Sequence, residues 1–254
     1  MKKISVPFAQ MYCTSVYLGN PRGTISTISN FIYAARKNNM QLALVKRKTK
    51  SIFDQNPQLL AEYPDVTLFE CTDESALHLC ELLIAETKQR IVFRNKFCIE
   101  NDIPLETAKL PDTMKKASRY IRQNTQPLLV MVEDFCEFSS SMQSSALSTY
   151  QNIFTNGKGY NIYFTSFFYP KDKDKLGSDL LIKYYNEDAL MMFFGGQFQN
   201  QGLTLLPTEY RNNTEPQKQY NRFLLRYMGN FHALVMPCGN IADDELDPDD
   251  RPIL

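Results

Sequence analysis

The sequence of 254 residues has no excess of charge of either sign, no long apolar run and only two histidines. Lysine and arginine number 28, as do aspartate and glutamate, and this balance argues against a dedicated nucleic-acid-binding protein, although it is compatible with a local basic patch. The longest apolar runs, PLLVMV and ALMMFF, are far shorter than the roughly 20 residues of a transmembrane helix. We therefore expect neither a signal peptide nor a membrane span in this chain.

Cysteine and glycine are also informative. The six cysteines form no C-x-x-C pair, and with two histidines they do not suggest a zinc site, so we expect no metal. Scattered thiols fit a reducing cytosol better than a disulfide framework. The ten glycines suggest few flexible lids.

Apolar residues make up 43% of the chain, which is enough for a large core. Apolar segments alternate with helical patterns, and this order predicts an α/β fold with a mostly parallel sheet flanked by helices. Residues 222–237 predict a C-terminal hairpin that turns at Gly229-Asn230. Expected strands cover residues 14–19, 41–45, 66–71, 127–135, 160–168 and 189–196, and the first four of these are expected to be buried. Expected helices cover residues 24–39, 74–97, 113–124, 140–159 and part of 172–188.

The segment VYLGNPRGTIST lies between the first strand and the first helix, as a phosphate-binding loop does. Aligned with G-x-x-x-x-G-K-[ST] on Gly19, it has Thr24 at the second glycine, Ile25 at the lysine and Ser26 at the hydroxyl position. The lysine normally neutralises phosphate charge, so its loss weakens the site. Ile25 shares a helical face with the apolar residues that follow, and we expect it to pack into the core.

Other residues of this loop offer partial substitutes. Gly23, one residue early, supplies some of the conformational freedom that Thr24 lacks. Arg22 is a candidate substitute cation. The candidate nucleotide-binding residues are therefore Gly19, Arg22, Gly23, Thr24, Ile25, Ser26 and Thr27.

The strand at residues 127–135 ends in Glu133 and Asp134, at the position where a P-loop nucleotide site places the acids that hold Mg²⁺ and orient water. The usual order is aspartate first, so this is a degenerate form of that motif. The alternative is a strand that simply ends at a solvated acidic turn.

Five segments follow one another in a characteristic order: VYLGNPRGTISTISNFIYAA, AETKQRIVFRNKF, PLLVMVEDFCEF, GYNIYFTSFFYP and LMMFFGGQFQNQGLTLLP. This order resembles the FtsK/SpoIIIE-type ATPase family, and within it most closely the C-terminal, degenerate third ATPase domain of the EssC-type proteins of type VII secretion. The likeness runs from Ser15 to Pro237. It implies a RecA-like (P-loop NTPase) fold, with residues 1–240 as one domain of a longer multidomain protein and residues 241–254 as an acidic tail.

The resemblance also implies a sensor at the end of the fifth strand, usually alanine–threonine–glutamine. Thr165, Ser166 and Phe167 stand there, so an aromatic ring replaces the sensor glutamine. Together with Thr24, Ile25 and the reversed acids, this substitution predicts a domain that does not hydrolyse ATP. We expect no cofactor beyond weak binding of ATP and Mg²⁺ at the loop amides and Ser26.

The family further implies a place on the cytoplasmic side of a bacterial membrane, reached only through the parent chain. Its implied partners are neighbouring ATPase domains and secreted helical hairpins of the WXG100 type, with a role in substrate recognition or regulation of export. Apolar residues in SFFYPKDKDK are candidate contacts, with core packing as the alternative. Two other functions stay open: an active ATPase that uses Arg22, and a DNA translocase. The neutral charge disfavours nucleic acid as a partner.

Overall fold

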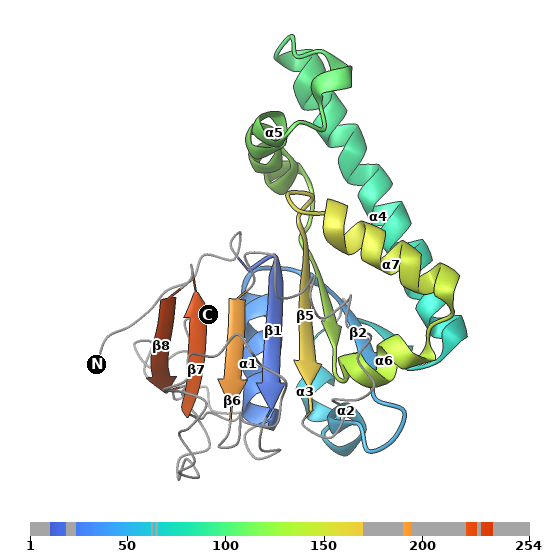
Figure 1. Cartoon of the computed structure of the whole chain (residues 1–254), viewed down its shortest axis with the longest axis vertical. Coiled ribbons are helices and arrows are strands. Elements are labelled where there is room, and N and C mark those ends of the chain that lie inside the picture. Colours follow the sequence, from blue (N-terminus) through green and yellow to red (C-terminus); the bar gives the residue numbers. More distant parts are fainter. Residues whose placement is uncertain are drawn as a thin grey trace.

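The computed structural model describes residues 11–18, 24–61, 63, 66–169, 190–194, 222–227 and 230–235. Its centre is a sheet of eight strands in the order β3-β2-β4-β5-β1-β6-β7-β8 (Figure 1). The strands are β1 Cys13–Leu18, β2 Gln41–Lys46, β3 Val66–Glu70, β4 Leu128–Val132, β5 Ile162–Phe168, β6 Leu190–Phe194, β7 Arg222–Tyr227 and β8 Asn230–Val235.

The first six strands in this order, β3, β2, β4, β5, β1 and β6, are parallel to one another. Strand β7 pairs antiparallel with both β6 and β8. The predicted mostly parallel α/β sheet and the C-terminal hairpin are therefore confirmed. Asn230 is already the first residue of β8, and Gly229 lies outside the described residues.

The central strands β1, β4 and β5 are buried along their whole length, as their uninterrupted apolar or small residues predict. Strand β3 differs from the prediction, because it is an edge strand rather than a buried one. Only Phe69 among its residues is buried, and Leu68 is 49% exposed. An apolar run of this length cannot by itself distinguish a central strand from an edge strand.

Helices cover both faces of the sheet (Figure 1). On one face α1 packs with the short α2 and α3, and on the other α4, α6 and α7 pack together. The helices are α1 Thr24–Lys37, α2 Ile52–Gln55, α3 Gln58–Ala61, α4 Asp73–Glu100, α5 Pro111–Asn124, α6 Phe135–Ser141 and α7 Ser144–Asn156, with a 3₁₀ turn at Leu105–Thr107.

The expected helix over residues 140–159 is instead two helices. Met142 has an extended backbone, so α6 ends before it and α7 starts at Ser144. The sequence pattern missed α6 because that helix begins directly after the acidic pair, at Phe135, which was assigned to the strand, and its seven residues are too few to show a clear period. Helices α2 and α3, each of four residues, are too short to show a periodic pattern.

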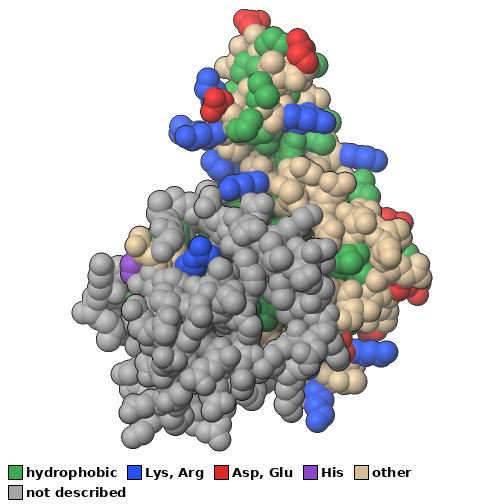
Figure 2. All heavy atoms as spheres, viewed as in Figure 1, with side chains coloured by type: hydrophobic (Ala, Val, Ile, Leu, Met, Phe, Trp, Pro, Cys, Tyr) green, Lys and Arg blue, Asp and Glu red, His purple; other side chains and the backbone are tan. Residues whose placement is uncertain are grey.

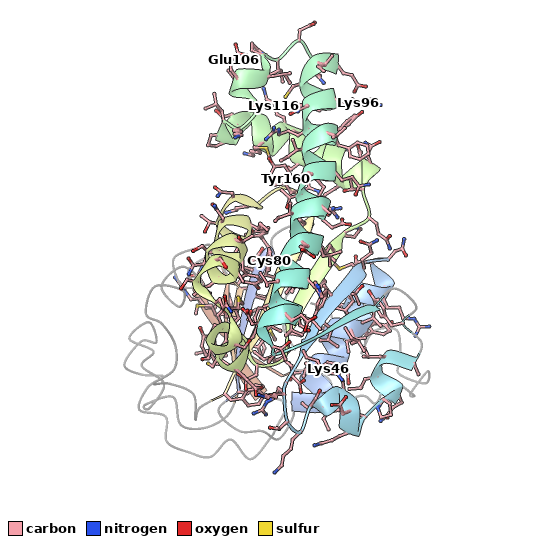
Figure 3. The ribbon with its side chains drawn as sticks, turned by 90° about the vertical axis from the view of Figure 1, so that its right-hand side faces the viewer. Lys46, Cys80, Lys96, Glu106, Lys116 and Tyr160 are labelled. Atoms are coloured by element: carbon pink, nitrogen blue, oxygen red, sulfur yellow. The ribbon has the colours of Figure 1, made fainter. Side chains whose placement is uncertain are left out.

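Helix α4 begins where predicted, with the Thr72 side chain accepting a hydrogen bond from the Ser75 backbone N–H at 3.2 Å. Its second half continues beyond the sheet and lies beside α5, forming an arm that projects from the body (Figures 1 and 3). None of the helices in the described part combines the length and apolarity that a bilayer crossing requires.

Two buried arginines of α4 fasten the base of this arm. Arg90 is 1% exposed, pairs with Glu86 and donates to the Gln126 carbonyl at 2.8 Å, just before β4. Arg94 is 5% exposed and donates to the Tyr160 hydroxyl at 2.6 Å, just before β5. The arm is therefore tied to the amino ends of two central strands.

Candidate nucleotide site

The carboxyl ends of β1, β5 and β4 meet at one edge of the sheet because the three strands run in parallel. Val16 of β1 lies opposite Phe167 of β5, and Val132 of β4 lies opposite Ser166. The loop position, the sensor position and the acidic pair therefore follow strands that lie next to one another. Ligands of open α/β sheets bind at this kind of edge.

Only part of the loop lies within the described residues. Gly19, Arg22 and Gly23 fall outside them, whereas Thr24 is the first residue of α1. Thr27 is 1% exposed, and Ser26 is partly buried.

The prediction that Ile25 packs into the core is wrong, because this side chain is 46% exposed. Helical side chains point toward the N-terminus of their helix. Ile25 lies in the first turn of α1 and precedes the first core residue of that helix, Ile28, by almost one turn. The other apolar residues expected on this face, from Ile28 onward, are buried, so the core contact of the helix starts about one turn after Ile25.

Glu133 is fully buried, and its carboxylate accepts three hydrogen bonds from the segment between β2 and α2. The donors are the Arg47 backbone N–H at 2.9 Å, the Ser51 hydroxyl at 2.7 Å and the Ile52 backbone N–H at 2.7 Å. Ser51 also caps α2 by accepting from the Phe53 N–H at 3.2 Å. Glu133 therefore fixes the start of α2 against the end of β4.

Asp134 is 1% exposed and serves as the N-cap of α6, where it accepts from the Glu137 N–H at 3.0 Å. Its second oxygen lies 3.3 Å from Nε of Arg47. Glu137 in turn accepts from the Lys48 N–H at 3.1 Å. The strand does not end at a solvated acidic turn, so that alternative is wrong, and the acids bind other parts of the protein.

Arg47 is the site residue that the sequence analysis missed. Its guanidinium lies 4.5 Å from the centre of the Tyr169 ring, directly after β5, and beside Asp134. Arg47 thus joins the ends of β2, β4 and β5. A usable signal was present, because the basic run KRKTK follows β2 and parallel strands end at the same edge.

The same acids perturb a neighbouring thiol. Burial, followed by the charges of Glu137, Asp134 and Glu133, raises the pKa of Cys71 to about 12, with Arg47 acting in the opposite direction. A thiol with this pKa stays protonated at neutral pH and is a poor nucleophile.

The sensor position is part of the core. Phe167 is fully buried and packs edge-to-face on Phe31 of α1, with 5.9 Å between ring centres. Ser166 is also fully buried and lies opposite Ser15 of β1. For Phe167 and the buried Phe168, core packing is therefore the correct alternative to a partner contact; residues 170–175 lie outside the described part.

Comparison with known proteins identifies the fold. No protein-family model matches the sequence, and a search of curated proteins gave no match. EssC (ATPases 2 and 3) from Geobacillus thermodenitrificans aligns with a TM-score of 0.64 at 11% identity, over 96% of this chain and 43% of that one. EccC (ATPases 2 and 3) of Thermomonospora curvata, in complex with a signal sequence peptide, aligns with a TM-score of 0.63 at 11% identity, over 91% of this chain and 38% of that one.

A third structure, the cytoplasmic domain of EssC, gives a TM-score of 0.61 at 13% identity, over 87% of this chain and 39% of that one. This chain thus spans about two-fifths of the length of the structures it matches. Another solved structure of this set is described as the cytoplasmic domain of a type VII secretion ATPase. The chain has the P-loop ATPase fold of the EssC and EccC cytoplasmic domains.

Proposed function

We propose that this chain is an ATPase-like domain of a type VII secretion motor that does not hydrolyse ATP and that acts in substrate recognition or in regulation of export. The observation that supports inactivity most directly is the environment of Glu133. Its carboxylate is fully buried and accepts three hydrogen bonds from the protein itself.

A magnesium-coordinating or water-activating acid needs lone pairs that face the nucleotide. Hydrogen bonds to a charged group contribute about 1.5–3 kcal/mol each, so freeing Glu133 for a metal-bound water costs several kcal/mol. Asp134 is likewise engaged as a helix cap and as the partner of Arg47. Phe167 adds a buried ring where a polar sensor would contact the γ-phosphate.

The proposed ligands and partners follow from this assignment. ATP with Mg²⁺ binds weakly at the loop amides and Ser26, or not at all. The protein partners are neighbouring ATPase domains of the same parent chain and secreted helical hairpins of the WXG100 type. The domain lies on the cytoplasmic side of the bacterial membrane, to which only the parent chain connects it.

Calorimetric titration with ATP and Mg²⁺, together with a steady-state ATPase assay, tests the proposal. We expect no turnover and a dissociation constant above about 100 µM, which corresponds to a binding free energy weaker than about −5.5 kcal/mol. Low-micromolar binding would refute the degenerate site. Turnover that Arg22→Ala abolishes would establish instead an active ATPase with a substitute cation.

The DNA-translocase alternative has a separate test. A salt-dependent gel shift with duplex DNA would support it. We expect no such shift. A pull-down with candidate secreted hairpins then tests the recognition role.

A further inference from the structure

The exposed face of α5 carries a cluster of positive charge. Lys115, Arg119 and Arg122 are exposed and follow one another at spacings of four and three residues, which places them on one side of the helix. Lys116 is exposed beside them and lies on the arm (Figure 3). We call these four residues the α5 basic face.

No member of the α5 basic face forms an ion pair with another residue that the structure describes. The ion pairs of the described residues involve other cations, namely Lys46, Arg47, Arg90 and Lys96. Within α5 the single acid is Asp112, in the first turn. A chain with no net charge therefore carries on α5 four cations against a single acid of the same helix.

A buried cation strengthens this field. Arg94 of α4 packs in the base of the arm and hydrogen-bonds to Asn95 and Tyr160, which are both neutral. Among the described residues no carboxylate lies within ion-pair distance of Arg94. Charges in a low-dielectric environment are screened less than surface charges, so Arg94 adds to the positive potential of the arm.

The end of the arm is acidic. Glu100, Asp102, Glu106 and Asp112 are exposed there, and Figure 2 shows acidic side chains at the end of the arm with basic side chains below them. A flat, extended anion such as a bilayer or a DNA duplex would meet these carboxylates as it approached α5, and like charges repel. A short acidic segment can lie on the side of α5 without reaching the tip.

We propose that the α5 basic face is a docking surface for a short acidic peptide segment of a partner protein. From Lys115 to Arg122 the face is about 10 Å long at 1.5 Å per residue, which matches three or four residues of an extended chain or two turns of a helix. Recognition of acidic motifs by clusters of cations is a recurring mode of peptide binding. The proposal does not depend on whether the domain hydrolyses ATP.

Fluorescence anisotropy with a labelled peptide of eight glutamates tests the proposal, with a peptide of eight glutamines as the uncharged control. We expect the glutamate peptide alone to bind, and the triple variant K115E/R119E/R122E to weaken binding at least tenfold. The matched control K48E/K50E/K88E reverses three exposed lysines outside α5 and should change the affinity less than twofold. If the reversal variant does not fold, K115Q/R119Q/R122Q replaces it.

Three results would overturn the proposal. The first is no binding of the glutamate peptide at low salt. The second is an equal loss of peptide affinity in the α5 variant and in the matched control, which would mean that binding depends on the total charge of the protein rather than on α5. The third is tighter binding of duplex DNA or phosphatidylserine vesicles than of the peptide, lost in the α5 variant, because it would assign the face to an extended anion.

Discussion

Glu133→Gln distinguishes a structural acid from a catalytic one. The glutamine has the shape of glutamate, but it has one acceptor oxygen where the carboxylate has two. In the native protein one oxygen of Glu133 accepts from the Arg47 N–H and the Ser51 hydroxyl, and the other accepts from the Ile52 N–H. Either orientation of the amide therefore points an N–H₂ group at a backbone donor.

The expected cost is the loss of one or two hydrogen bonds to a charged acceptor, or about 2–4 kcal/mol of unfolding free energy. For a domain of this size, that loss lowers the melting temperature by roughly 4–16 °C. Urea denaturation followed by circular dichroism measures it. Glu81→Gln, which removes the same charge from the exposed surface of α4, is the matched control and should leave the midpoint unchanged.

A catalytic Glu133 would behave in the opposite way. The substitution would abolish measurable ATP turnover and leave stability unchanged, because a catalytic carboxylate is not saturated by internal donors. Neutral surface substitutions typically change the free energy of unfolding by no more than about 0.5 kcal/mol. If Glu133→Gln changed it by no more than that, the structural role would be refuted.

Three further predictions follow from the same region and from α4. Phe167→Gln places a polar residue at the sensor position but removes a fully buried ring that packs on Phe31. We expect urea denaturation to show a loss of about 3–5 kcal/mol of unfolding free energy, with no gain of ATPase activity. ATP turnover in a folded variant would contradict this. Thr72→Ala removes the N-cap of α4 and should cost about 0.5–2 kcal/mol in the same assay, whereas Thr72→Ser should cost much less. Because the pKa of Cys71 is raised to about 12, its thiolate fraction at pH 9 is about 500-fold below that of a thiol of pKa 9, and iodoacetamide should label it only in urea. The raised pKa also makes the free energy of unfolding fall as pH rises from about 9 toward 12, since the unfolded chain loses that proton first. Burial also raises the pKa of Cys80, Tyr163 and Tyr169, which act in the same direction. We therefore expect the midpoint to fall less steeply with pH in Cys71→Ser than in the wild type, and equal slopes would contradict the assignment to this thiol.

Much of the fold follows from local patterns in the sequence. The apolar run of β4 and the helical spacing of α1 and α4 are strong enough to define those elements, and their alternation defines a parallel sheet. The hairpin of β7 and β8 was also predictable from two apolar segments around a short polar turn. These features depend on residues close together in the chain, which is why composition and spacing reveal them.

The position of a strand in the sheet is not a local property. The sequence of β3 resembles that of a buried strand, yet among the described strands β3 lies at the edge of the sheet and its Leu68 is half exposed. For the same reason the exposure of Ile25 could not be read from the helical face of α1. That exposure depends on which other elements pack over the first turn of the helix, which is a property of the tertiary structure.

The sequence by itself predicted which residues would stand at the loop, acidic and sensor positions of a P-loop ATPase fold, and it showed that Thr24, Ile25, the Glu133-Asp134 order and Phe167 depart from the usual motifs. Only the tertiary structure decided what the acids do instead. Glu133 and Asp134 contact Arg47 and its neighbours, more than 80 residues earlier in the chain. Such contacts form when separate strands end at one edge of the sheet, and local spacing does not specify which donor each buried carboxylate will meet there.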